Sequence, residues 1–155
     1  MSVDVGAKAP DFTLPNQDRE AVTLSEQWKK GPVVLAFFPG AFSGTCTKEM
    51  CTFRDSASEL NTVGATVIGV SPDTFFALKA WADAEKFTFS LLSDYNREVL
   101  GTYDVVNPDM IGLKNIAKRA VFVIDGHGVV RYREVLDDAR HEPDYAKVKQ
   151  AVASA

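Results

Sequence analysis

The longest uninterrupted hydrophobic runs in the chain are short and rich in β-branched and aromatic side chains. Val33 to Phe38 (VVLAFF) is closed by a Pro-Gly pair, and Thr66 to Val70 and Ala120 to Ile124 have the same character. Such runs are typical of strands that are buried on both faces of a sheet. We therefore expect three strands here, with Val33 to Phe38 in the middle of the sheet.

Between the first two runs, the spacing of hydrophobic residues changes to three and four. This period predicts an amphipathic helix over residues 44 to about 61. A second helix is expected after Ser71-Pro72-Asp73, whose side chains can cap it, and a third over residues 143–153. The residues that set the first period are Met50, Phe53, Ala57 and Leu60.

Two hairpins complete the predicted elements. Asp11 to Leu14 and Ala21 to Leu24 flank a polar stretch, which predicts an N-terminal β-hairpin, and a glycine-containing turn joins Ala120–Ile124 to Val129–Tyr132. The order of elements predicts an α/β fold of the thioredoxin-like kind, a mixed central β-sheet flanked by helices. Since neither repeats nor linkers interrupt the sequence, we expect a single domain over residues 1–155.

Composition and charge narrow the possible partners. A net charge of -4, with Lys and Arg scattered along the chain, argues against nucleic-acid binding. The N-terminal residues do not resemble a secretory signal, and no hydrophobic run is long enough to span a membrane. We therefore expect a cytoplasmic protein with no membrane partner.

The two cysteines, Cys46 and Cys51, are too few for a disulfide framework. One or both could be small buried side chains, as many unpaired cysteines are. Their spacing also lacks the Cys-x-x-Cys pattern of structural zinc sites and of disulfide oxidoreductases. We expect neither a metal nor a cofactor.

Cys46 nevertheless occupies a position that suits chemistry. The segment Pro39 to Cys46 leads from the central strand into the first predicted helix, so Cys46 should lie in or beside its first turn. Unpaired backbone N–H groups and the positive end of the helix dipole favour a thiolate there. Ser43 could place its hydroxyl beside the sulfur, cap the helix, or do both.

At this point the chain resembles the peroxiredoxins, thiol peroxidases of the AhpC/TSA type. Pro39, Ser43 and Cys46 match their signature of a proline, a Thr or Ser four residues later, and the peroxidatic cysteine three residues after that. Further landmarks follow in the expected order, so the resemblance spans nearly the whole chain. They are residues 9–14 (APDFTL), 91–94 (LLSD) and 118–125 (KRAVFVID).

The resemblance implies a role for each site residue. Cys46 would be the peroxidatic cysteine, Ser43 would hydrogen-bond the thiolate and the incoming peroxide, and Pro39 would shield the sulfur. Arg119 would hold the thiolate and polarise the peroxide, and Glu49 would orient Arg119. A guanidinium beside a thiol lowers its pKa, and fixed donors stabilise the charge that develops on the departing oxygen. Phe42 could also wall the peroxide pocket.

The position of Cys51, five residues after Cys46, is similar to that of the resolving cysteine in the peroxiredoxin Q, or bacterioferritin comigratory protein, group. This likeness implies an intramolecular disulfide that a thioredoxin-like or other thiol reductant recycles. The substrates would be hydrogen peroxide and organic hydroperoxides. The chain has no cysteine after Cys51, so a resolving thiol in a C-terminal arm is excluded, and we expect a monomer or homodimer.

Two alternatives remain open. Residues 38–42 are also similar to one-cysteine peroxiredoxins, in which an external thiol resolves the sulfenate. A non-enzymatic redox-sensing or holdase protein could use the same cysteines without turnover.

Overall fold

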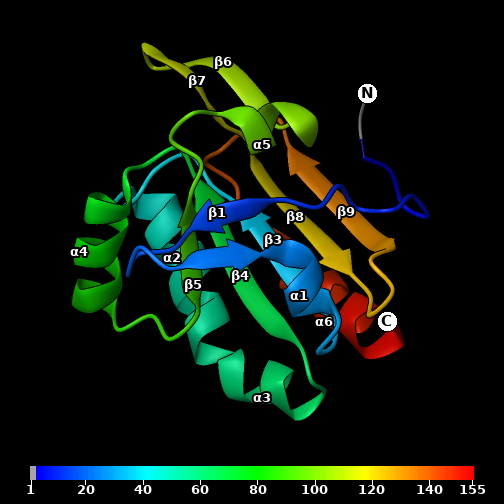
Figure 1. Cartoon of the computed structure of the whole chain (residues 1–155). Helices are drawn as coiled ribbons and strands as arrows, with labels where there is room; N and C mark the ends of the chain where they lie inside the picture. The colour runs from blue at the N-terminus through cyan, green and yellow to red at the C-terminus, as the bar shows by residue number, and fades with distance from the viewer. Residues whose placement is uncertain (1–2) are drawn as a thin grey trace.

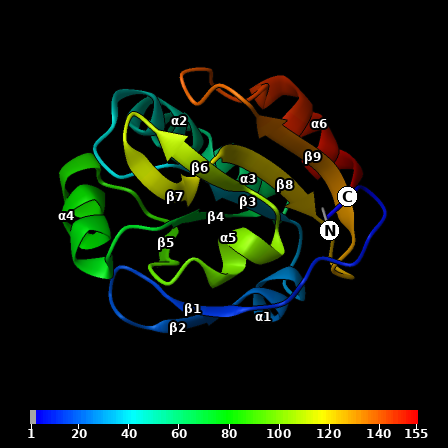
Figure 2. The same ribbon diagram turned by 90° about the horizontal axis from the view of Figure 1, so that it is seen from above.

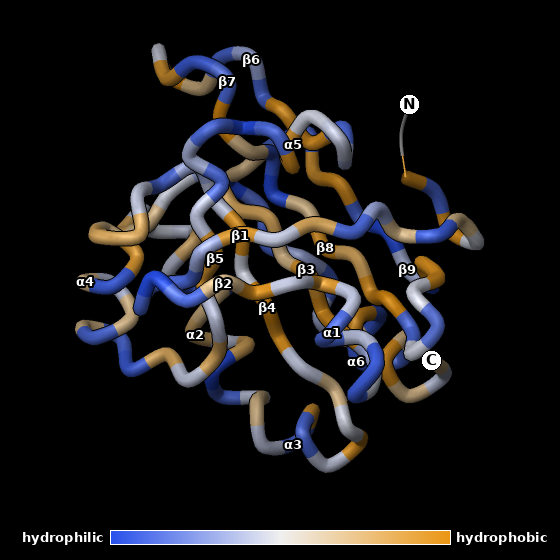
Figure 3. The backbone as a smooth tube through the Cα atoms, viewed as in Figure 1, coloured by the Kyte–Doolittle hydropathy of each residue, from blue (hydrophilic) through white to orange (hydrophobic). Residues whose placement is uncertain are grey.

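The computed structural model of the protein describes residues 3–155, so the first two residues of the predicted domain lie outside it. At its centre is a mixed sheet with the strand order β5-β4-β3-β8-β9 (Figure 1). These strands are β3 (Val33–Phe37), β4 (Thr66–Ser71), β5 (Ser90–Ser93), β8 (Arg119–Ile124) and β9 (Val130–Leu136). β3 lies in the middle, as predicted, parallel to β4 and antiparallel to β8. Figure 3 shows hydrophobic residues concentrated along these central strands.

Helices cover one face of the sheet (Figure 2). They are α2 (Gly44–Asp55), α3 (Ala57–Thr62), α4 (Phe75–Glu85) and α6 (Tyr145–Ser154). Met50 of α2, Trp81 of α4 and Val148 of α6 are buried in one cluster with Val34 and Ala36 of β3. The apolar stripe that predicts α2 is therefore the surface that packs on the sheet.

The other face carries shorter elements. They are β1 (Thr13–Pro15), β2 (Ala21–Thr23), α1 (Leu24–Trp28) and α5 (Glu98–Thr102). β1 and β2 form the predicted antiparallel hairpin. Leu24 and Leu100 are buried from this side against Leu35 and Phe37 of β3, so a hydrophobic core lies on each face of the sheet. Within residues 3–155, the helices are too short and too polar to cross a lipid bilayer.

A third hairpin was not anticipated from the sequence. β6 (Val106–Met110) pairs antiparallel with β7 (Leu113–Ala117) and takes no part in the central sheet. Figure 1 shows this hairpin projecting from the body of the molecule beside α5. Its segments, VNPDM and LKNIA, carry neither a continuous apolar run nor a regular alternation, so the mutual pairing of the two strands stabilises them.

The prediction of one helix over residues 44–61 is wrong, because the helix is interrupted at Ser56. The ψ angle of Ser56 is -2°, far from the helical value near -42°. The interruption lets α3 run in a different direction from α2 (Figure 1). Leu60 thereby stays buried in the same cluster as Val67 while the chain turns toward the start of β4. The spacing of hydrophobic residues alone does not show whether they belong to one straight helix or to two helices with an interruption between them.

The predicted cap of α4 is also wrong. Thr74, and not Ser71 or Asp73, is the N-cap, and its hydroxyl accepts a hydrogen bond from the backbone N–H of Ala77 at 3.3 Å. The Ser71 hydroxyl instead donates to the Asp73 carboxylate at 2.7 Å. The same carboxylate oxygen accepts the backbone N–H of Ala41 at 2.7 Å. The two side chains therefore hold a loop and leave the helix cap to Thr74.

Candidate active site

Cys46 lies in the first turn of α2, where the chain has just left the central strand β3. Ser43 is the N-cap, so Cys46 is the third residue of the helix, and its side chain is fully buried. Backbone N–H groups in this turn have no partner in a preceding turn, and the helix dipole is positive here. Both effects stabilise negative charge on the sulfur, as the sequence predicts.

Arg119, the first residue of β8, lies against this sulfur although 73 residues separate the two in the chain. Its Nη2 donates to Cys46 Sγ at 3.2 Å and its Nη1 to Glu49 Oε1 at 2.8 Å. Nε and Nη2 also donate to the backbone oxygen of Ala139, at 3.1 and 2.9 Å. Only 1% of Arg119 is exposed, so these acceptors fix the orientation of the guanidinium and aim one donor at the sulfur.

Glu49, one turn after Cys46 on α2, is 0% exposed. Burial raises the pKa of its carboxyl to about 8, although the charge and hydrogen bond of Arg119 act in the opposite direction. Its second oxygen, Oε2, has no hydrogen-bond partner among the residues that the structure describes. The Arg119 guanidinium is therefore shared between the buried Glu49 carboxyl and the Cys46 sulfur.

The raised pKa of Glu49 predicts a pH dependence of stability. The unfolded chain releases this proton near pH 4.5 and the folded protein near pH 8, so stability should fall as pH rises between these values. With about 1.4 kcal/mol per pKa unit, the loss amounts to roughly a few kcal/mol. Urea unfolding at the two ends of this range should show a much smaller fall in Glu49→Gln. The exposed Glu59→Gln is the control, and an equal fall in wild type and Glu49→Gln would contradict the assignment.

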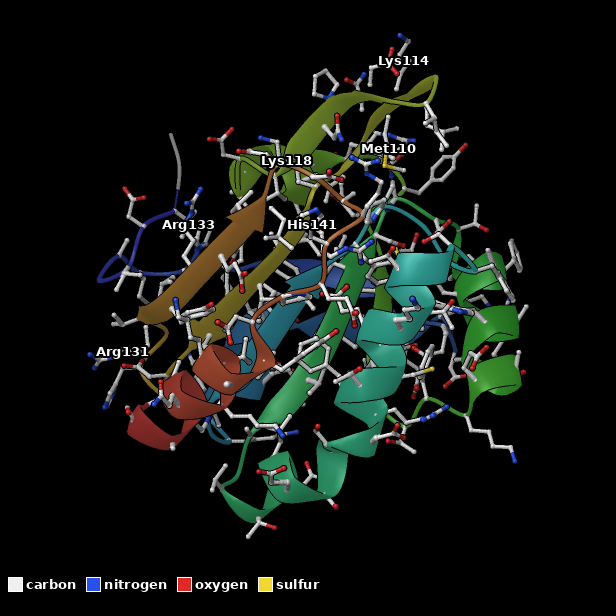
Figure 4. The ribbon with its side chains drawn as sticks, turned by 180° about the vertical axis from the view of Figure 1, so that it is seen from behind. Met110, Lys114, Lys118, Arg131, Arg133 and His141 are labelled. Carbon is white, nitrogen blue, oxygen red and sulfur yellow. The ribbon has the colours of Figure 1, made fainter. Side chains whose placement is uncertain are left out.

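A small cavity of about 130 Å³ lies between Arg119 and the residues that immediately precede Cys46. Arg119 forms part of its wall, and Met110 approaches it from the β6–β7 hairpin. In Figure 4, Met110 lies on the side of this hairpin nearest the N-terminal end of α2. The lining residues are Pro39, Ser43, Gly44, Thr45, Met110, Arg119 and Ala139. A molecule of only a few heavy atoms can therefore reach the donors around Cys46.

Comparison with known proteins places the chain in a family. The model of the AhpC/TSA family matches residues 5–133. The chain belongs to the AhpC/TSA family. It is 40% identical to peroxiredoxin Q of Triticum aestivum over 130 residues, which are 84% of this chain and 58% of that protein.

Two solved structures extend the comparison to the AhpC/TSA fold. Peroxidoxin BcpB of Mycobacterium tuberculosis superposes with a TM-score of 0.85 and 33% identity, covering 98% of this chain and 96% of that one. A peroxiredoxin-like protein of Aquifex aeolicus gives a TM-score of 0.89 at 25% identity, covering 99% and 88%. The predicted thioredoxin-like fold and the resemblance to peroxiredoxins are confirmed. As an AhpC/TSA member, the protein is a thiol-dependent peroxidase that uses a hydroperoxide and a thiol reductant.

In this AhpC/TSA chain, the site residues named from the sequence come together, with the exception of Cys51. Arg119 contacts both Cys46 and Glu49, and Pro39 and Ser43 line the cavity. The Ser43 side chain is exposed and makes no capping hydrogen bond within the described chain, so its hydroxyl is not committed to the helix.

Phe42 is not among the residues that line the cavity. It is 57% exposed, its φ is +67°, and its ring lies 6.2 Å from that of Trp81. Met110 occupies the wall instead, and no signal in the sequence links Met110 to Cys46. The Ala139 oxygen was also missed, because every residue has a backbone carbonyl and only the fold selects this one.

Asp73 is a further residue whose role the sequence does not reveal. Its carboxylate accepts the N–H of Ala41, in the loop between β3 and α2, and the hydroxyl of Ser71, at the end of β4. These contacts fasten the loop that precedes Cys46 to the end of a neighbouring strand. Asp73 thus helps to place the first turn of α2 over the sheet.

Cys51 lies on a different side of α2 from Cys46. It is half-buried, and its Sγ donates to Glu85 Oε2 of α4 at 3.5 Å. Burial raises the pKa of the Cys51 thiol, and the hydrogen bond to Glu85 raises it further. Both cysteines are unpaired thiols in the part of the chain that the structure describes.

Proposed function

We propose that Cys46 is the peroxidatic cysteine of this peroxidase and that Arg119 is its electrostatic partner. The observation that carries the proposal is the 3.2 Å hydrogen bond to Cys46 Sγ from Nη2 of Arg119, a residue that lines the cavity. A buried cation aimed at a buried thiol favours the thiolate, which is the attacking form. Loss of turnover in Cys46→Ser tests the assignment.

The proposed reaction uses the groups around the cavity. The Cys46 thiolate attacks one peroxide oxygen, an S–O bond forms as the O–O bond breaks, and a hydroxide or alkoxide leaves and takes up a proton. Arg119 stabilises the charge that develops on the leaving oxygen, because its donors are already oriented. The Ser43 hydroxyl can donate to the peroxide, and Pro39 covers the sulfur. The substrates that we propose are hydrogen peroxide and organic hydroperoxides, which would reach Arg119 through the cavity.

We further propose that Cys51 resolves the Cys46 sulfenate within the same chain. Both residues belong to α2, and five residues of ideal helix place their Cα atoms about 8.7 Å apart on different faces. A disulfide needs a Cα separation below about 7 Å, so the helix must open locally. Gly44 and the β-branched Thr45 and Thr47 make the first turn the weakest part.

This proposal predicts the products of a single turnover. One equivalent of hydrogen peroxide should lower the intact mass by two hydrogens without forming a dimer, and amide exchange across residues 46–52 should become faster. The control, Cys51→Ser, should instead gain one oxygen as the sulfenate. A stable sulfenate in the wild type, with unchanged exchange, would mean a one-cysteine enzyme that an external thiol resolves.

The recycling partner that we propose is a thioredoxin-like or other thiol reductant, which attacks the Cys46–Cys51 disulfide. A reducing compartment such as the cytoplasm suits an enzyme whose two thiols must be regenerated. We expect a monomer or homodimer.

A further inference from the structure

The contact between Cys51 and Glu85 joins two helices and is not used by the reaction proposed for Cys46. Cys51 lies in the second half of α2, and Glu85 is the last residue of α4. Besides the 3.5 Å hydrogen bond from Sγ to the Glu85 carboxylate, Arg54 of α2 donates to the Glu85 backbone oxygen at 2.6 Å. Glu85 is therefore held from α2 at both its side chain and its backbone.

The charges around Cys51 favour the neutral thiol. Burial and the Glu85 carboxylate raise its pKa, Asp55 acts in the same direction, and Arg54 acts against them. The thiolate is the form that attacks sulfur, so a thiol that donates to a carboxylate is a poor nucleophile. In the folded helix Cys51 is consequently both too far from Cys46 and in the unreactive protonation state.

We propose that Glu85 is a positioning residue that keeps Cys51 protonated and in contact with α4 while α2 is folded. Cys51 then becomes nucleophilic only when α2 opens. The proposal rests on the proposed role of Cys51 as the resolving cysteine. Glu85 also slows disulfide formation in a second way, because its contact with Cys51 ties α2 to α4 and resists the opening of α2.

The resolving step then balances without an outside oxidant or reductant. When α2 opens, Cys51 leaves Glu85, loses its proton to solvent and attacks the sulfur of the Cys46 sulfenic acid. The S–S bond forms as the S–O bond breaks, and the departing hydroxide takes up a proton and leaves as water. Both sulfurs end at the disulfide level, since the Cys51 sulfur is oxidised by one electron and the Cys46 sulfur is reduced by one.

The expected consequence of the Glu85 contact is slower formation of the Cys46–Cys51 disulfide. Both effects of Glu85 prolong the life of the Cys46 sulfenate, and a sulfenate that persists can react with a second peroxide to give the sulfinic acid. Removing the Glu85 charge should therefore speed disulfide formation and reduce overoxidation at high peroxide. The attack of Cys46 on the first peroxide should not change, since Glu85 does not line the cavity.

The test compares Glu85→Gln, which keeps an acceptor of the same size but removes the charge, with wild type. Asp83→Asn on the same helix is the control, because the Asp83 side chain is 64% exposed and pairs with Lys79. The protein is mixed with one equivalent of hydrogen peroxide and quenched with an alkylating agent, and the disulfide is followed by intact mass from about pH 6 to pH 9.

Disulfide formation at pH 7 should be about two- to tenfold faster in Glu85→Gln, because α2 no longer has to break a hydrogen bond to a charged acceptor when it opens. The midpoint of the pH–rate profile should move to lower pH, and Asp83→Asn should match wild type. An unchanged rate, a slower rate, or a faster rate with an unmoved midpoint would overturn the role of Glu85. No disulfide in wild type at any pH would instead remove the proposed role of Cys51, and with it this inference.

Discussion

Replacing Cys46 by serine is expected to abolish hydroperoxide turnover. The serine hydroxyl remains protonated even beside Arg119, so the site loses the sulfur nucleophile that we propose. Removing the nucleophile of an enzyme that works through a covalent intermediate lowers turnover by about 10⁴-fold or more. Consumption of hydrogen peroxide in the presence of excess dithiothreitol measures the effect.

The control for this variant is Cys51→Ser, which leaves the buried thiol and its arginine in place. With dithiothreitol as an external thiol, Cys51→Ser should still oxidise Cys46 in a single turnover, whereas Cys46→Ser should not consume peroxide at all. Turnover of Cys46→Ser within a factor of a few of wild type would show that the peroxidatic cysteine has been wrongly assigned.

Replacing Arg119 by methionine is expected to slow the reaction of Cys46 with peroxide by about 10²–10³-fold. Methionine fills much of the buried volume but lacks the charge and the donor that lies 3.2 Å from Cys46 Sγ. The variant also loses the neighbouring cation that favours a thiolate over a neutral thiol. Single-turnover oxidation can be followed by the fluorescence of Trp81, which is buried in the same cluster as Cys46.

Two further variants separate the geometry of Arg119 from its charge. Arg119→Lys keeps a cation but loses the planar guanidinium, which contacts the Cys46 sulfur, the Glu49 carboxyl and the Ala139 oxygen together. The oxidation of Cys46 should therefore also be slow in this variant. Arg140→Met removes an exposed charge from the residue that follows Ala139, and this variant should react with peroxide at the wild-type rate. If Arg119→Met matched wild type, the proposed role of Arg119 would be wrong.

The strand and the helix that carry the site can be predicted from the sequence. The apolar run 33–38 marks a strand covered on both sides, and the change to a period of three and four marks α2, whose first turn contains Cys46. These are properties of neighbouring residues, since side-chain periodicity follows directly from strand and helix geometry. The same logic does not detect α1, α5 or the β6–β7 hairpin, because these short mixed segments are stabilised by what they pack on or pair with.

The chemistry of the site depends on contacts across the chain. Resemblance to a family names Arg119 and Glu49, but only the packing of β8 against α2 buries the two side chains together and aims the guanidinium at Cys46. A pKa depends on which charges and how much water surround a group, and neighbours in sequence do not determine that. The raised pKa of Glu49 and the hold of Glu85 on Cys51 are therefore decided by the tertiary structure, whereas the position of the nucleophile at a helix start is determined by the sequence itself.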